Sequence, residues 1–147
     1  MHITFTIGRV LLVLIFIISG AFKLYVLQAT ADQIKAMVAI PAALSGIVTQ
    51  IEGATGMAMP RILAIMAGVI EVVGGALVAF NIGTRGAAFV LALFTLVATF
   101  YFHAFWNMSG EAMQSNMIHA MKNLAVIGGL LVFVVLGSWR PVQSNQM

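Results

Sequence analysis

The sequence has no cysteine, only three prolines and very few charged residues. Among its 147 residues, Asp, Glu, Lys and Arg together account for 7%. The absence of cysteine excludes structural disulfides, thiolate metal sites and a membrane dithiol relay, so any redox chemistry must use a bound cofactor. The scarcity of charge excludes an ordinary water-soluble domain, in which about 25% of residues are charged.

The basic residues that are present do not form a patch. The formal net charge is +3 and the isoelectric point is about 9.8, values that are compatible with nucleic-acid binding. The seven Lys and Arg residues, however, are scattered singly along the chain. We therefore predict no nucleic-acid partner, and we interpret these residues as topology signals and buried functional charges.

Apolar residues dominate: 62% of the chain is hydrophobic and the mean hydropathy is +1.09. Four apolar stretches, each close to the ~20 residues that cross a bilayer, occupy residues 7–27, 62–80, 87–106 and 120–136. The first stretch is longer than the apolar core of a secretory signal and has no clear cleavage site. The sequence predicts an all-α integral membrane protein, a compact antiparallel four-helix bundle in one domain covering residues 1–147, with the lipid bilayer as its surroundings.

The long connection over residues 28–61 carries a helical pattern of its own. Apolar residues recur there at helical spacing, at Ile40, Leu44, Ile47, Val48 and Ile51. Pro41 is suited to start this helix, and Gly53 and Gly56 are suited to end it. We predict an interfacial amphipathic helix between the first and second spans, either as a lid or as a plain anchor of the loop.

The orientation follows from the basic residues outside the apolar core. In a four-span chain, Arg9, Arg85 and Arg140 share one face of the membrane, and Lys35 and Arg61 lie on the other. Because Lys and Arg are enriched on the cytoplasmic side, this slim excess predicts that both termini are cytoplasmic.

Several polar residues stand inside the apolar spans, where ionisable groups are costly and usually mark function. Glu71 lies roughly 15 Å along its helix from Arg61, near the bilayer midplane. Lys23 is close to the far end of the first span. Because side chains lean toward the N-terminus of their helix, Lys23 and Glu71 lean toward each other and are predicted to pair. In the alternative, Lys23 extends to the membrane surface and Glu71 is buried neutral.

The other polar residues of the third and fourth spans lie toward the same side. Thr95, Thr99 and His103 follow one another at intervals of four, and His119, Lys122 and Asn123 share a side of the fourth span. We predict a pocket with Glu71 and His103 as catalytic residues and with four ligand-binding residues: Lys23, Lys122, Asn123 and Trp106. Trp106 and Trp139 also fit the role of interfacial anchors. Nothing in the His spacing specifies a haem or zinc site, so no metal is predicted.

Five short motifs resemble the DoxX family of small four-helix membrane proteins. They are Gly20-Ala21-Phe22-Lys23, Glu71-Val72-Val73-Gly74-Gly75, Gly83-Thr84-Arg85, His103-Ala104-Phe105-Trp106 and Met121-Lys122-Asn123-Leu124. The resemblance implies a bacterial inner-membrane protein in a family that includes a subunit of a thiosulfate:quinone oxidoreductase and partners of membrane-linked redox systems. The connection between Pro41 and Arg61 is longer than the family pattern implies.

Three functional hypotheses remain open. In the first, the chain is a quinone-linked redox component whose polar cluster binds a quinone, a small redox-active molecule, and passes protons. In the second, it is an assembly or accessory subunit that binds a protein partner or forms a homo-oligomer, with the ion pair fixing helix register. Transport of a small organic anion is the third. Because the sequence has neither cysteine nor a cofactor motif, it is at most a subunit of a quinone-dependent oxidoreductase.

Overall fold

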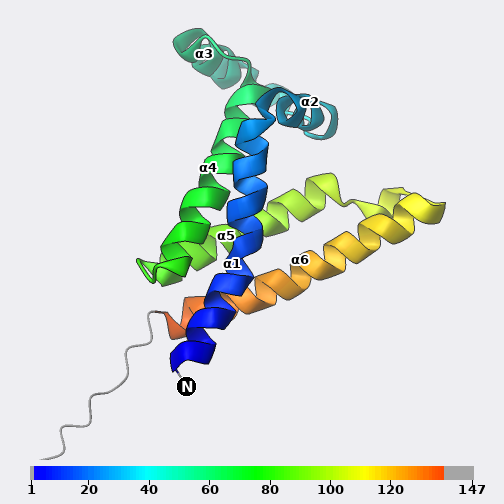
Figure 1. Ribbon diagram of the computed structural model, residues 1–147. Coiled ribbons are helices and arrows are strands. Elements are labelled where there is room, and N and C mark those ends of the chain that lie inside the picture. The colour runs from blue at the N-terminus through cyan, green and yellow to red at the C-terminus, as the bar shows by residue number, and fades with distance from the viewer. Residues whose placement is uncertain (1, 138–147) are drawn as a thin grey trace, which may run out of the picture.

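The computed structural model describes residues 2–137, and every regular element in that range is a helix. Four of these helices are long and apolar enough to cross a membrane (Figure 1): α1 (His2–Tyr25), α4 (Met59–Ala79), α5 (Thr84–Phe102) and α6 (Gly110–Leu136). The predicted all-α class and the four spans are confirmed. Trp139 and Arg140 lie outside the described residues.

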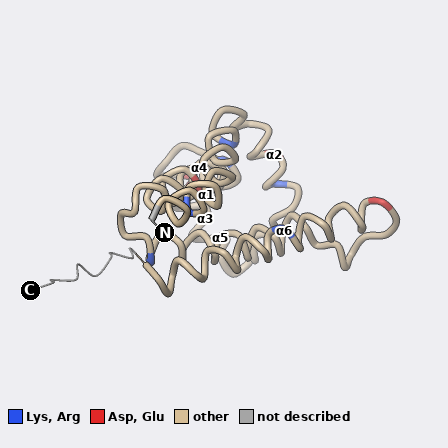
Figure 2. Tube along the Cα trace, turned by 60° about the horizontal axis from the view of Figure 1, so that its bottom comes forward, with Lys and Arg blue, Asp and Glu red and all other residues tan. Residues whose placement is uncertain are grey.

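The four long helices alternate in direction and form two antiparallel pairs, α1 with α4 and α5 with α6. Figures 1 and 2 both show that the pairs meet at the end that carries the N-terminus and the α4–α5 turn. Toward the other end, the α5–α6 pair diverges from the α1–α4 pair. The predicted bundle is present, and it is more open at this second end than a compact bundle would be.

Glycine residues allow the backbones of α1 and α4 to approach each other very closely. A Cβ on Gly20 of α1 would lie 2.7 Å from the carbonyl oxygen of Gly68 on α4, and a Cβ on Gly75 would lie 2.8 Å from a side-chain carbon of Ile17. Only residues without a side chain allow such an approach, which is the usual basis of close helix packing in membranes. These contacts fix how α1 is placed against α4.

Two groups of buried apolar side chains stabilise the arrangement. The larger core joins all four long helices and consists of Val13, Phe16, Val78, Ala88, Leu91, Ala92, Leu130 and Phe133. The smaller core joins α2 (Leu27–Met37) to α4 through Ala31, Ile34 and Ala64, and Phe102 of α5 packs against it. The second core therefore brings the end of α5 toward α2.

The connection between α1 and α4 contains more helix than predicted. The segment in which we predicted an amphipathic helix contains a short 3₁₀ helix (Ala42–Leu44) followed by α3 (Ser45–Thr55). It begins after Pro41 and ends at Gly56, whose φ is +67°, as their residue types indicate. No residue of α3 is buried, and its position at the membrane surface stays a prediction. Helix α2 (Leu27–Met37), which precedes this segment, was not predicted.

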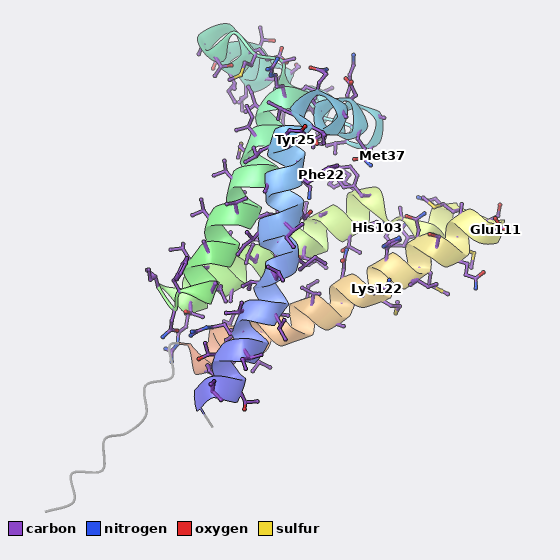
Figure 3. The ribbon with its side chains drawn as sticks, viewed as in Figure 1. Phe22, Tyr25, Met37, His103, Glu111 and Lys122 are labelled. Atoms are coloured by element: carbon purple, nitrogen blue, oxygen red, sulfur yellow. The ribbon has the colours of Figure 1, made fainter. Side chains whose placement is uncertain are left out.

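The ends of the third and fourth spans also differ from the prediction. Helix α5 ends at Phe102, and a short 3₁₀ helix (Phe105–Asn107) follows. Helix α6 begins at Gly110 rather than at residue 120, so most of the predicted 107–119 connection is helical. Hydropathy marks where a helix becomes apolar, and α6 continues beyond that point with polar side chains. Figure 3 places Glu111 at the far tip of this extension.

Candidate functional site

The predicted ion pair between Lys23 and Glu71 is confirmed. The Nζ of Lys23 donates to both carboxylate oxygens of Glu71, at 2.7 and 3.0 Å. The same ammonium group also donates to the hydroxyl of Ser19, one helical turn earlier on α1. The alternative in which Lys23 extends away to the membrane surface is therefore wrong.

The ion pair is enclosed by the close packing of α1 on α4. The side chain of Glu71 is 7% exposed and that of Lys23 is 29% exposed. A Cβ on Gly20 would lie 2.8 Å from the Cβ of Glu71, so the glycine provides the space in which the carboxylate reaches across to α1. The carboxylate of Glu71 therefore depends on Lys23, because at this degree of burial water does not replace a missing partner.

A cavity of about 400 Å³ adjoins the ion pair. Its walls come from α1, α2, α4 and α5, and its polar lining residues are Lys23, Thr30, Gln33, Glu71, Tyr101 and His103. The remaining lining is apolar, with aromatic rings from Phe94 and Phe102. A volume of ~300–1,000 Å³ with a few polar groups on an apolar wall is typical of small-molecule sites.

A smaller cavity of about 100 Å³ lies beside the first and shares Glu71, Phe94 and Ala98 with it. Asn123 of α6 lines only this smaller cavity. The Nδ2 of Asn123 donates to the hydroxyl of Thr99 on α5 at 2.8 Å, and this hydroxyl donates in turn to the carbonyl oxygen of Thr95. Asn123 therefore links α6 to α5 next to the carboxylate of Glu71.

His103 is held in a defined orientation by α6. Its Nδ1 lies 3.0 Å from the Oδ1 of Asn116, whose amide nitrogen donates to the carbonyl oxygen of Ala112. Because this leaves the amide oxygen to accept, the hydrogen-bond network assigns the imidazole proton to Nδ1 and leaves Nε2 as an acceptor. The ring also stacks on His119, with the centroids 5.1 Å apart. Within residues 2–137, no group of three His, Asp or Glu side chains could hold a metal ion.

Two predicted site residues, Lys122 and Trp106, line neither cavity. Lys122 is exposed on α6, because consecutive residues of a helix are about 100° apart and only Asn123 faces α5. Trp106 follows the end of α5, where the spacing from His103 is no longer helical. Its ring is half exposed and packs against the rings of Phe100 and Phe105. The predicted cluster from all four spans is therefore only partly brought together.

The structure adds site residues that the sequence analysis did not identify. Thr30 and Gln33 reach the cavity from α2, and Tyr101 reaches it from α5. The apolar residues Leu27, Ala31, Ile34 and Val38 of this region recur at helical spacing. Extending the first span's periodicity through these positions would have revealed α2 and the side that it turns toward α4.

Comparison with known proteins agrees with the motifs. The sequence profile of the DoxX family matches residues 4–104, which run from the first turn of α1 to just beyond the end of α5. The inner membrane protein YphA of Escherichia coli (strain K12) is 30% identical over 131 residues, which cover 89% of this chain and 81% of that protein. No solved structure matches. With its four apolar helices, the chain is a multi-pass protein of the inner-membrane type, and it belongs to the DoxX family.

Proposed function

We propose that the 400 Å³ cavity binds the head group of a small redox-active molecule, a quinone, and that the protein is a component of a quinone-linked redox system. The observation that carries this proposal is the position of the Lys23–Glu71 pair. A cation, a carboxylate and the imidazole of His103 line one cavity whose walls are otherwise mostly apolar.

The cavity residues match the chemistry of a quinone ring. Each quinone carbonyl accepts a hydrogen bond, and the ammonium group of Lys23, the amide of Gln33 and the hydroxyl of Tyr101 can donate one. The Nε2 of His103 can accept from a hydroquinone hydroxyl or, when the imidazole is protonated, donate to a carbonyl. Flat aromatic side chains such as Phe94 and Phe102 suit the face of the ring.

Reduction of a quinone to a hydroquinone takes up two electrons and two protons. In this proposal His103 and Glu71 transfer protons, and the electrons come from a partner protein that carries its own redox cofactor. The chain itself has no cysteine to take part in electron transfer. It therefore acts as a subunit that binds and protonates the quinone and not as a complete oxidoreductase.

Titration of the purified protein with a short-chain quinone analogue tests the proposal. We expect saturable binding of the analogue in its hydroquinone form, whose hydroxyl group can donate to the Nε2 of His103. His103→Ala and Gln33→Leu should each weaken this binding by about 0.5–1.5 kcal/mol, the usual net worth of a hydrogen bond between neutral groups. Lys122→Ala is the matched control. Lys122 was predicted from the sequence to belong to the same pocket as His103, but it lines neither cavity. Absence of saturable binding, or equal weakening by the control, would contradict the proposal.

An accessory role is the second candidate, and the dense α1–α4 contact favours it. In this case the Lys23–Glu71 pair only fixes helix register, and the outer faces of the helices bind a protein partner or a second copy of the chain. Purification in a mild detergent distinguishes the two functions. A stoichiometric protein partner without bound quinone supports the accessory role, and bound quinone supports the first proposal.

We also propose that both termini are cytoplasmic, on the basis of the excess of Lys and Arg at that end. Compartment-sensitive reporters fused at Met147 and inserted at Ser109 are expected to report opposite sides of the membrane. Insertion at Ser109 avoids α6, which begins at the next residue. Because a single span, α6, lies between the two positions, reports from the same side would contradict the four-span topology. Opposite sides with the compartments exchanged would reverse the orientation.

A further inference from the structure

Arg9 is a buried arginine whose Nε has no hydrogen-bond partner among the residues that the structure describes. The residue is only 8% exposed, and its Nε is inaccessible to solvent. It lies on the same side of α1 as Val13, which is fully buried, and Phe5, whose ring is 5.2 Å from that of Phe133 on α6. An arginine cannot lose its charge in a protein, so burial without an anion is strongly unfavourable.

No acidic side chain of the chain can supply that anion. The four acidic residues are Asp32, Glu52, Glu71 and Glu111. Asp32 and Glu52 belong to α2 and α3, and Glu111 is at the far tip of α6. Glu71 is bound by Lys23. It faces Gly20, which lies about 16 Å along α1 from Arg9 at ~1.5 Å per residue.

The surroundings of Arg9 can be inferred from helical geometry. The large core brings together Val13 of α1, Ala88 of α5 and Phe133 of α6. One helical turn from each of them, toward the end where the helix pairs meet, lie Arg9, Thr84 and Gly137. The side chain of Arg85 packs against Gly137, so a second guanidinium lies at this same end.

The beginning of α5 adds further positive potential. Helix α5 starts at Thr84, and its N-cap residue, Gly83, provides no side-chain cap. The first amide groups of a helix point outward and carry a partial positive charge that favours an anion. Arg9 and Arg85, together with the first turn of α5, form what we call the arginine site.

We propose that the arginine site binds the phosphate group of an anionic phospholipid. The side chain of Arg9 leans toward the N-terminus of α1 and hence toward the membrane surface, where lipid phosphates lie. The planar guanidinium matches two phosphate oxygens at once. An anionic lipid neutralises the site, whereas the choline group of a zwitterionic lipid already compensates its own phosphate.

The test uses delipidated full-length protein in a neutral detergent, to which phosphatidylglycerol or phosphatidylcholine is added. We expect native mass spectrometry to show preferential retention of phosphatidylglycerol, and we expect this lipid to raise the midpoint of thermal unfolding. Arg9→Met keeps the size of the side chain and removes its charge, and it should lower the apparent affinity for phosphatidylglycerol at least tenfold. Arg61→Met is the matched control, because Arg61 is an exposed arginine at the opposite end of the helices.

Each further arm has a defined outcome. Arg9→Lys keeps the positive charge but lacks the planar guanidinium, so this variant should bind phosphatidylglycerol more weakly than wild type. If Arg9→Met does not fold, Arg9→Lys provides the test. Equal retention of both lipids, or wild-type affinity in both Arg9 variants, overturns the proposal. Stabilisation by millimolar inorganic phosphate equal to that by the lipid would assign the site to a free anion and overturn the lipid. None of these results depends on quinone binding.

Discussion

The two helix pairs are held together by different kinds of contact. In the α1–α4 pair, the backbones approach at Gly20 and Gly68, and a single ion pair crosses the contact. In the α5–α6 pair, the described polar contacts are made between side chains, from Thr99 to Asn123 and from His103 to Asn116. The first contact is fixed by sterics. The second combines apolar packing in the larger core with hydrogen bonds that rotamer changes can rearrange.

The two helix pairs also contribute different groups to the cavity. The α1–α4 pair holds two charges at a fixed separation, and α5 adds aromatic side chains and an imidazole oriented from α6. Substitutions in the α1–α4 contact should therefore lower the free energy of unfolding more than substitutions in the α5–α6 contact.

The largest effect is expected at the ion pair. Lys23→Met or Glu71→Gln alone should lower the free energy of unfolding by about 3 kcal/mol, at the lower end of the range for buried pairs because Lys23 is partly exposed. The double variant should lose less than the sum of the two single variants, because no charge is then left alone. Unfolding of the detergent-solubilised protein measures all three values. Strictly additive losses would mean that the two residues do not interact.

A smaller loss is expected at the glycine contact. Gly20→Ala should destabilise the protein by about 1–3 kcal/mol, because the new methyl group meets a backbone oxygen that cannot move aside. Gly128→Ala in α6 is the control, since nothing lies within 4 Å of its Cβ position. There alanine should be neutral or stabilising by up to about 1 kcal/mol through helix propensity. Equal effects on thermal unfolding would contradict the close approach of α1 and α4.

The smallest effect is expected in the α5–α6 pair. Asn123→Ala removes the hydrogen bond to Thr99 and should lower the free energy of unfolding by about 1 kcal/mol. Lys122→Ala, one residue away and exposed, should change it by less than about 0.5 kcal/mol. A loss at Asn123 as large as that at the ion pair would remove the contrast between the two pairs.

The spans and the ion pair could be predicted because they follow from simple physical rules. Hydropathy locates apolar helices, and the lean of side chains along a helix decided that Lys23 and Glu71 converge. Helix ends were less predictable. Helix α6 extends through polar residues to Gly110, and α2 is too polar to register as a span, so neither could be found by hydropathy.

The residues of the candidate site were predicted only in part, because they depend on which face each helix turns toward its neighbours. Asn123 and Lys122 are equally polar neighbours, and only the packing of α6 on α5 turns one inward and the other outward. The same holds for Gly128 and Gly129, of which only the second meets a neighbouring side chain, that of Leu12. Sequence alone does not fix this rotation.

The glycine contacts also restrict how the protein can change shape. A piston movement of α1 along α4 would push side chains into the space that Gly20, Gly68 and Gly75 leave empty. Sliding of α1 along α4 is therefore blocked, and the two helices form a rigid unit. Any rearrangement that admits or releases a ligand must therefore come from α5 and α6, which diverge from the first pair at the open end, or from α2.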